Sequence, residues 1–246
     1  MEVRQMFKIV RNVLLVLMIG VVIAGCSKSS SPANTIGPGS SAPQLKTPQF
    51  KGPASTSASA DTSQGALIAK STAAEFNALT SGFMAFYSGS GTHSGNSWTW
   101  TFTENGLTGT WTATSSSTGY DWSFVENGTS GSTAYNNWTA LSGTESSDGK
   151  SGSWTIYYTN TDTPEAVASW STGGSGNLTG TVLVYNTSGT QTGKWIFTDN
   201  ADNSGELKTY SGSVLTWDIK WSSNGSGTWV EYDPYTGAEV NSGSWS

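Results

Sequence analysis

The sequence predicts an all-β fold, an antiparallel up-and-down meander of about ten to twelve short strands curled towards a barrel, with one N-terminal amphipathic helix. All twelve tryptophans lie at or after Trp98, so the large side chains of a core are confined to the C-terminal part of the chain. There, aromatic and hydroxyl residues alternate, as in Trp98-Thr99-Trp100-Thr101-Phe102-Thr103, with the period of a half-buried strand. Turn signals separate these runs at intervals that fit a strand plus a tight turn.

The first 25 residues have the layout of a secretory signal. Arg4, Lys8 and Arg11 form a basic start, and an apolar run over residues 13–23 is followed by small residues. This run is too short to cross ~30 Å of hydrocarbon as a helix, which takes about 20 residues. We therefore expect residues 1–25 to be a signal peptide that is removed.

The only cysteine, Cys26, directly follows Ile23-Ala24-Gly25. This stretch resembles the lipobox of bacterial lipoproteins. The resemblance implies that the Cys26 thiol receives a diacylglyceryl group, that the signal is cleaved before Cys26, and that the new amino terminus receives a fatty acid such as palmitate. Several acyl chains together hold a protein durably on a membrane. The alternative is a general secretory signal with an incidental cysteine.

The residue after the lipidated cysteine bears on localisation. In bacterial lipoproteins an aspartate there retains the protein at the inner membrane. Here Ser27 follows Cys26. The resemblance therefore implies a lipid anchor in the outer membrane of the cell envelope, with the periplasmic or surface face left open.

Charge and cysteine content narrow the range of partners. Residues 26–246 carry eight Lys and Arg against sixteen Asp and Glu, a net charge near −8. So acidic a chain is a poor partner for nucleic acid. With Cys26 lipidated, no thiol remains to form a disulfide within the domain, so the apolar core must stabilise it alone. No motif indicates a cofactor.

The mature chain divides into a tether and a domain. Residues 26–70 contain the lipidated cysteine and a Ser-, Pro- and Thr-rich stretch that we expect to be a flexible tether. Residues 71–246 form the β domain, beginning with a helix at about residues 71–87. Thr72-Ala73-Ala74-Glu75 matches a capping box, and apolar residues follow at three- and four-residue steps, namely Phe76, Leu79, Phe83 and Phe86.

Nearly every predicted strand places one tryptophan on the same face. So large an exposed apolar face would aggregate, so we expect a buried core rather than a platform for stacking sugar rings. A transmembrane barrel is the rival architecture, but most runs are shorter than the 9–11 residues or so that a tilted membrane strand needs. The predicted turns between strands are Asn105-Gly106, Asn127-Gly128, Asp148-Gly149, Gly173-Gly174, Asn224-Gly225 and Asp233-Pro234.

A Gly-x-Trp motif recurs at Gly109, Gly152, Gly193, Gly227 and Gly243. The stretch from Gly227 to Trp245 resembles MORN-like hairpin repeats of bacterial proteins, in which Gly-x-Trp opens a strand and a turn containing glycine ends it. The likeness is good over the last twenty residues or so and weaker elsewhere, because the spacing drifts. It implies stacked hairpins and no particular chemistry.

Residues that could carry catalysis or bind metal are sparse. His93 is the only histidine, and we expect it in a solvated loop. Residues 199–206 resemble part of a calcium loop, but Ser211 stands where a bidentate Glu belongs, so a polar turn is the better interpretation. The scattered acids Glu104, Asp121, Glu126 and Asp218 show no spacing typical of a glycosidase pair. We predict no catalytic residues and no metal site.

The sequence also predicts a second apolar face. From Trp154 onward several apolar residues have the strand parity opposite to the tryptophans, namely Tyr157, Val167, Leu183, Tyr185, Ile196, Val230 and Tyr232. Such a patch suits an interface, with Tyr157, Tyr185 and Tyr232 as candidate anchors because aromatic residues dominate binding sites. We expect the helix to cover part of this patch or to cap one open end of the barrel.

Two functions from different classes fit these features. The first is a non-catalytic envelope lipoprotein that binds a protein partner or a polysaccharide. The second is a purely structural surface lipoprotein without a small ligand. A glycan-active hydrolase is a further, less favoured alternative.

Overall fold

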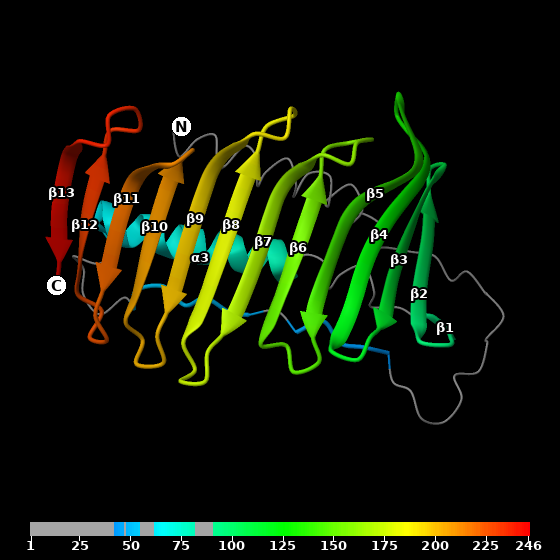
Figure 1. Cartoon of the computed structure of the whole chain (residues 1–246), viewed down its shortest axis with the longest axis horizontal. Helices are drawn as coiled ribbons and strands as arrows, with labels where there is room; N and C mark the ends of the chain where they lie inside the picture. The colour runs from blue at the N-terminus through cyan, green and yellow to red at the C-terminus, as the bar shows by residue number, and fades with distance from the viewer. Residues whose placement is uncertain (1–41, 47, 55–61, 82–90) are drawn as a thin grey trace.

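A computed structural model describes residues 42–46, 48–54, 62–81 and 91–246, and it confirms the predicted meander. One sheet holds thirteen strands in sequence order, each antiparallel to its neighbours, against the ten to twelve or so expected (Figure 1). The helix α3 precedes them. The elements are α3 (Gln64–Ser81), β1 (Thr92–Ser94), β2 (Ser97–Glu104), β3 (Leu107–Ser115), β4 (Gly119–Ser130), β5 (Thr133–Ser146), β6 (Ser151–Tyr157), β7 (Pro164–Thr172), β8 (Leu178–Tyr185), β9 (Gln191–Asp199), β10 (Gly205–Ser211), β11 (Val214–Trp221), β12 (Gly227–Tyr232) and β13 (Glu239–Trp245).

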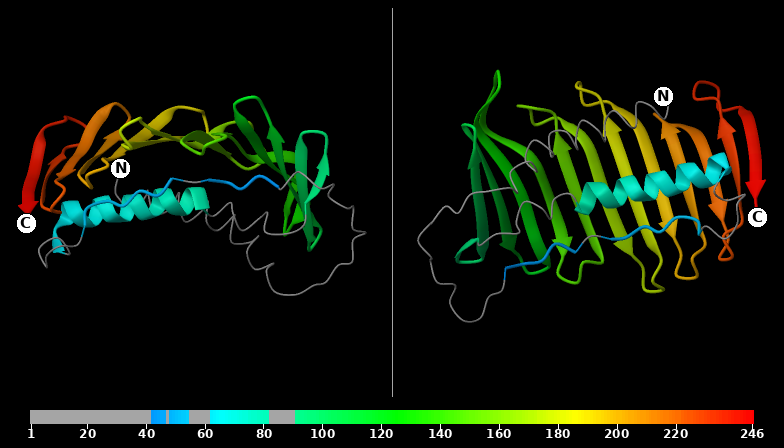
Figure 2. Two further views of the ribbon diagram at one scale, coloured as in Figure 1. Left: turned by 90° about the horizontal axis from the view of Figure 1, so that it is seen from below. Right: turned by 180° about the vertical axis from the view of Figure 1, so that it is seen from behind.

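The sheet is curled and remains open. Strands β1 and β13 lie at its two edges and do not pair with each other. The sheet arches over α3, so it has a concave face towards the helix and a convex face away from it (Figure 2). Among the residues described, no helix is long and apolar enough to cross a membrane.

The tryptophans form the core on the concave face, as the alternation predicts. Eleven of the twelve are at most 8% exposed, and only Trp195 is partly exposed. Rings from distant strands meet directly: Trp154 on β6 lies 6.0 Å from Trp111 on β3 and 6.4 Å from Trp122 on β4, between ring centroids. The tryptophan face is therefore a packed core and not an exposed platform.

The Gly-x-Trp motif has a steric explanation. Its glycines lie on the concave face, and at four of the five an aromatic ring from a neighbouring strand lies over the glycine. Trp170 covers Gly152, Trp245 covers Gly227 and Trp229 covers Gly243, while Phe102 covers Gly109. Only Gly193 has no ring above it. The missing side chain leaves space for the flat ring, which in turn shields the glycine backbone.

The helix begins earlier than predicted. It starts at Gln64 rather than about residue 71, so Thr72 lies inside the helix and does not cap it. Its buried stripe is formed by Ala66, Ala69, Ala73 and Phe76, at three- and four-residue steps. The small residues let the helix approach the sheet closely, and Gly65 lies directly against the Trp229 side chain. Phe83 and Phe86 lie outside the described residues.

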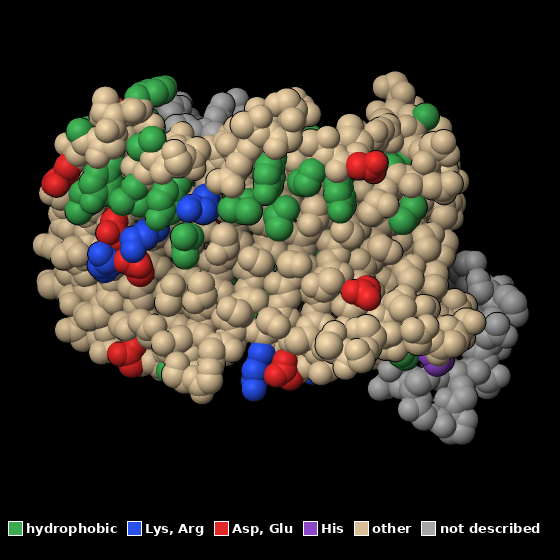
Figure 3. Space-filling model, in the orientation of Figure 1, with side chains coloured by type: hydrophobic (Ala, Val, Ile, Leu, Met, Phe, Trp, Pro, Cys, Tyr) green, Lys and Arg blue, Asp and Glu red, His purple; other side chains and the backbone are tan. Residues whose placement is uncertain are grey.

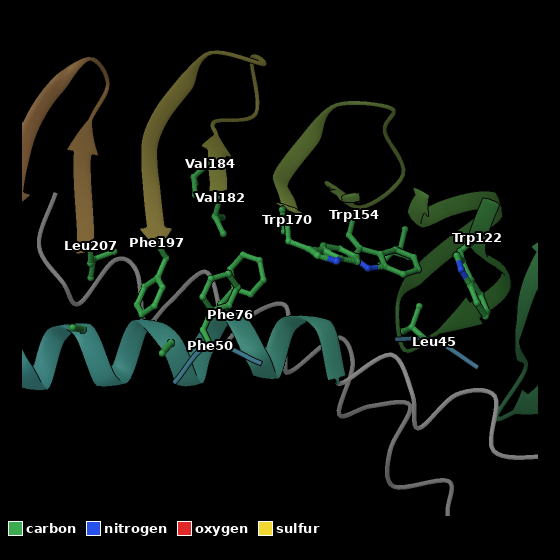
Figure 4. Packing of buried hydrophobic residues seen from close by; sticks show 14 of the residues in the cluster. Leu45, Phe50, Phe76, Trp122, Trp154, Trp170, Val182, Val184, Phe197 and Leu207 are labelled. Atoms are coloured by element: carbon green, nitrogen blue, oxygen red, sulfur yellow. The ribbon is translucent and has the colours of Figure 1, made fainter. Parts of the chain in front are cut away.

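Residues 42–46 and 48–54, here called the strap, correct the prediction of a free tether up to residue 70. The strap runs across the concave side of the sheet next to α3 (Figures 1 and 2), and its Leu45 and Phe50 are each 3% exposed. The Phe50 ring packs edge-on against Phe76 of the helix at 4.6 Å and Phe197 of β9 at 4.9 Å (Figure 4). Two isolated apolar side chains thus dock a segment whose composition is otherwise that of a linker.

Side chains from the sheet and the helix bind the strap backbone. The amide N–H of Lys46 donates to Glu145 Oε1 at 2.8 Å, and that of Lys51 donates to Asp199 Oδ2 at 2.5 Å. Asn77 of α3 forms a pair of bonds with Phe50, accepting from its N–H and donating to its carbonyl, each at 2.8 Å. These acceptors and donors satisfy an extended backbone that has no strand partner.

The turns follow the prediction with one exception. Asn105 and Gly106 both have positive φ, at 50° and 86°, as expected for a two-residue hairpin turn. Asn127-Gly128, predicted to be a turn, lies inside β4 instead, where the register with β5 shifts between Glu126 and Gly128. Gly128 has a φ of 119°, so this Asn-Gly pair forms a bulge in a long strand.

Buried carboxyl groups should make the domain more stable in mild acid. Burial raises the pKa of Glu75 to about 7; it also raises that of Glu145 to about 7, although the backbone N–H and charge of Lys46 act in the opposite direction. In the unfolded chain the pKa of each group is near the ordinary glutamate value of 4.5. Between these pH values the folded state binds more protons than the unfolded chain. The stability that Glu75 and Glu145 contribute is therefore fully present below about pH 4.5 and is lost as pH rises through about 7.

We therefore expect a melting temperature several degrees higher at pH 5 than at pH 8, measured by far-UV circular dichroism. Glu75→Gln should raise the value at pH 8 and reduce the difference. The control is Asp233→Asn, because Asp233 is an exposed acid with a hydrogen-bonded carboxylate. This replacement should not reduce the difference in melting temperature between pH 5 and pH 8. Equal melting temperatures at the two pH values would show that these groups ionise freely in the folded protein.

Candidate functional site

The convex face carries a continuous row of half-buried side chains. In cross-strand register, Thr155 of β6 pairs with Val167, Val167 with Leu183, Leu183 with Lys194, Lys194 with Tyr210, and Tyr210 with Leu215 of β11. Directly paired residues point to the same face of a sheet. We use the name convex band for this row together with the other half-buried apolar residues of that face, Tyr157, Tyr185, Ile196, Val230 and Tyr232.

Apolar side chains gather in one half of the convex face and extend across many strands (Figure 3). A group of charged side chains lies beside them. Lys208 contacts Glu206 at 2.8 Å, and Lys220 contacts Glu206 at 3.4 Å and Asp218 at 3.0 Å. Burial would raise the pKa of Glu206, but the hydrogen bonds and charges of the two lysines outweigh it and lower that pKa. Two acids and two lysines therefore largely neutralise one another.

Lys194 lies in the centre of the row and is not part of this charged group. Its Nζ lies 4.1 Å from the centroid of the Tyr210 ring, which is a cation–π contact. The stem of Lys194 thus continues the apolar row while its charge rests on an aromatic face. Neither Lys194 nor Tyr210 was among the residues predicted as anchors. The two residues are paired across β9 and β10, and their contact could be predicted only by someone who knew that these strands are neighbours.

The three predicted tyrosines are half-buried and have the parity of the convex face in their strands, and Tyr157 also packs against the buried core cluster. Tyr157 hydroxyl contacts Ser142 Oγ at 2.9 Å, and Tyr157 and Tyr185 lie at the ends of β6 and β8, on either side of β7. With strands about 4.8 Å apart, the backbones of these two strands are ~10 Å apart. Tyr232, at the end of β12, is four strand spacings from β8, or ~19 Å. The structure thus brings Tyr157 and Tyr185 together and leaves Tyr232 apart.

Tyr158, which was not among the predicted tyrosines, lies next to Tyr157 and Tyr185. The Tyr158 hydroxyl donates to the Tyr185 carbonyl at 2.6 Å. Burial, and then the nearby charge of Glu165, raise the pKa of Tyr158, while burial raises the pKa of Glu165. Tyr158 directly follows Tyr157 and was not predicted, because it lies in the turn after β6, where strand alternation no longer applies.

The expectation that the helix covers the second apolar face is wrong. Helix α3 packs on the concave face, against β11, β12 and β13, with its alanine stripe towards the tryptophans. Residues 62–81 are therefore on the opposite side of the sheet from the convex band. Within the described part of the chain, the band has no helix over it.

The residues considered for chemistry are dispersed. Asp121 on β4 and Asp218 on β11 are seven strands apart, and Glu126 is buried at 7% exposure, where burial raises its pKa. In the candidate calcium loop, Asp199 binds the strap and Asp202 accepts from the backbone N–H and hydroxyl of Ser204. In the described ranges, no three metal-ligating side chains cluster.

His93 is not in a loop, as predicted, but in the short edge strand β1. Its ring stacks on Trp98 with 4.4 Å between centroids. The lone histidine thus extends the aromatic core at one edge of the sheet.

No protein-family model matches the chain, and a comparison with curated proteins found no significant match.

Proposed function

We propose that this protein is a membrane-anchored lipoprotein of the bacterial outer membrane whose β domain is a non-catalytic binding module for a protein partner or a polysaccharide. The observation that carries the binding role is the convex band. The concave face is filled by tryptophans, the helix and the strap, whereas the convex face presents half-buried tyrosines and aliphatic side chains across six or more strands. A contiguous patch of this kind is typical of an interaction surface.

The anchor rests on Cys26 and its position after Ile23-Ala24-Gly25. Cys26→Ser removes the thiol that would receive lipid, so we expect the variant to move from the membrane pellet to the soluble fraction. Cell fractionation with detection of the protein measures this directly. Ser27→Thr serves as the control, because it leaves the thiol in place. If the Cys26→Ser protein sediments with membranes as wild type does, the anchor is elsewhere.

The binding role predicts a loss of affinity on replacing the paired tyrosines. Tyr157→Ala combined with Tyr185→Ala should weaken binding at least tenfold, because aromatic anchors in an interface each contribute about 1–2 kcal/mol or more. Thr112→Ala lies on the convex face of β3, outside the band, and should leave affinity unchanged. Isothermal titration calorimetry with purified envelope polysaccharides is the measurement. Tryptophan emission is a poor reporter, since the tryptophans lie on the other face.

A protein partner is tested in cells. A photo-crosslinking amino acid at Leu183, in the middle of the band, should give a discrete adduct, and the same amino acid at Thr112 should not. Adducts at both positions would indicate collision rather than binding. No heat from any envelope polysaccharide and no adduct at Leu183 would favour the alternative, a structural surface lipoprotein without a ligand.

A further inference from the structure

The strap attaches the chain to the sheet close to Cys26, the residue that would carry the lipid. Its contacts lie at one edge of the sheet: Lys46 Nζ donates to the Ser147 carbonyl at 2.9 Å in the β5–β6 turn, and Lys51 Nζ donates to Asn203 Oδ1 at 3.1 Å in the β9–β10 turn. In a meander, alternate turns lie at the same edge. We call the edge with the turns at 147–150, 173–177 and 200–204 the strap edge, and the edge with the turns at 158–163, 186–190 and 212–213 the distal edge.

The strap is held to the sheet and the helix at several points. Its backbone bonds to β5 at Lys46 and to β9 at Lys51. These two strands are four spacings of about 4.8 Å apart, or ~19 Å, so the strap is held at two well-separated points of the sheet. At Gly52, with a φ of 69°, an added Cβ would lie 3.5 Å from Lys70 Cα of the helix, so strap and helix are also in close contact there.

The docked strap shortens the link to the membrane. From Cys26 to Ala42 the chain can reach at most about 55 Å, whereas from Cys26 to Gln64 it could reach about 130 Å if the strap were free. The strap begins at Ala42, which packs against the buried core. The distal edge lies ~27 Å farther, the length of an eight-residue strand such as β8.

We propose that the strap orients the domain on the lipid surface, with the strap edge towards the membrane and the distal edge away from it. This inference rests on the lipid anchor of the proposed function. Tyr157, Tyr185 and Tyr232 each stand at the end of a strand that finishes at the distal edge. The orientation therefore keeps the aromatic part of the convex band clear of the lipid and open to a partner.

The test uses the mature protein, purified from bacterial cells that express the full chain and placed in vesicles of phosphatidylethanolamine and phosphatidylglycerol with an energy acceptor on the headgroups. A fluorophore is attached to one introduced cysteine, which is the only free thiol because Cys26 carries lipid. Ser175→Cys is in the strap-edge turn before β8, and Thr187→Cys is in the distal-edge turn after it; both sites are exposed. We expect energy transfer at least twofold more efficient from position 175.

Two variants separate orientation from mere attachment. Inserting 16 or so Gly and Ser residues after Ser41 leaves the strap docked but roughly doubles the reach of the link, which should bring the two efficiencies together. Leu45→Asp with Phe50→Asp should release the strap with the same result, provided that circular dichroism shows the sheet intact. The insertion decides the question if this double variant does not fold.

The outcomes are distinct. Bound protein with equal transfer from the two positions, or with more from Thr187→Cys, overturns the orientation while leaving the anchor intact. A larger signal from Ser175→Cys that survives the insertion also overturns it, because the sheet edge would then bind lipid by itself. Protein that does not sediment with the vesicles refutes the lipid anchor, and with it the proposed function.

Discussion

Trp154→Ala is expected to lower the free energy of unfolding by about 3–5 kcal/mol, the usual cost of replacing a fully buried tryptophan. Trp154 is 1% exposed and joins two parts of the sheet, since it lies on β6 and its ring meets Trp111 on β3 and Trp122 on β4. Its removal would leave a cavity that these rings can fill only by moving away from their own strands. Urea unfolding followed by far-UV circular dichroism measures the change without depending on tryptophan emission.

Trp195→Ala is the matched control for this prediction. Trp195 is the one tryptophan that is partly exposed, and it too lies in a Gly-x-Trp motif. Its replacement should cost about 1 kcal/mol, because less apolar surface is lost and solvent fills the space. Equal costs for the two replacements would mean that the rings on the concave face are not the principal source of stability.

The strands and the face of the core could be predicted because their signal is local. In Trp98-Thr99-Trp100 the alternation itself says which side is buried, and Asn105-Gly106 specifies its own turn. The same parity argument places Tyr157 and Tyr185 on the second face. The alternation does not specify how strongly the sheet curves. It therefore cannot predict whether the sheet closes into a barrel.

The strap could not be predicted, because what holds it is distant in sequence. Leu45 and Phe50 stand among Pro, Gln and Lys residues, without any periodic pattern. Their segment is bound by Glu145 and Asp199, which are 99 and 148 residues away from the lysines whose amides they accept. Such contacts exist only once the sheet has formed.

The helix was misplaced for a related reason. The predicted helix range was based on aromatic residues near position 80 and was therefore too close to the C-terminal end. The helix residues that contact the sheet are mostly alanines, which give no distinct pattern in a Ser- and Ala-rich stretch. An alanine stripe is a strong packing face only opposite large side chains, and the tryptophans provide these. The position of the helix therefore depends on the concave face, which the helix sequence alone does not show.

Gly205→Ala is expected to destabilise the domain by about 2–4 kcal/mol, although it adds one methyl group to a strand. Gly205 opens β10, and an added Cβ would overlap the Trp221 ring and the carbonyl oxygen of Thr198 on β9. The ring is 4% exposed and held in the core, and the carbonyl belongs to the sheet, so neither can move away without breaking other contacts. Thermal unfolding should show a decrease of the order of 5–15 °C in a domain of this size.

Gly193→Ala tests whether this effect comes from the covering ring rather than from glycine as such. Gly193 lies in the neighbouring strand β9, and an added Cβ there would lie 3.6 Å from the Tyr210 carbonyl oxygen and 3.8 Å from Val184 Cβ, which are ordinary contact distances. Its replacement should be nearly neutral or slightly stabilising, because alanine reduces the freedom of the unfolded chain. If Gly193→Ala and Gly205→Ala destabilise equally, the loss of stability at Gly205 does not come from overlap with the Trp221 ring.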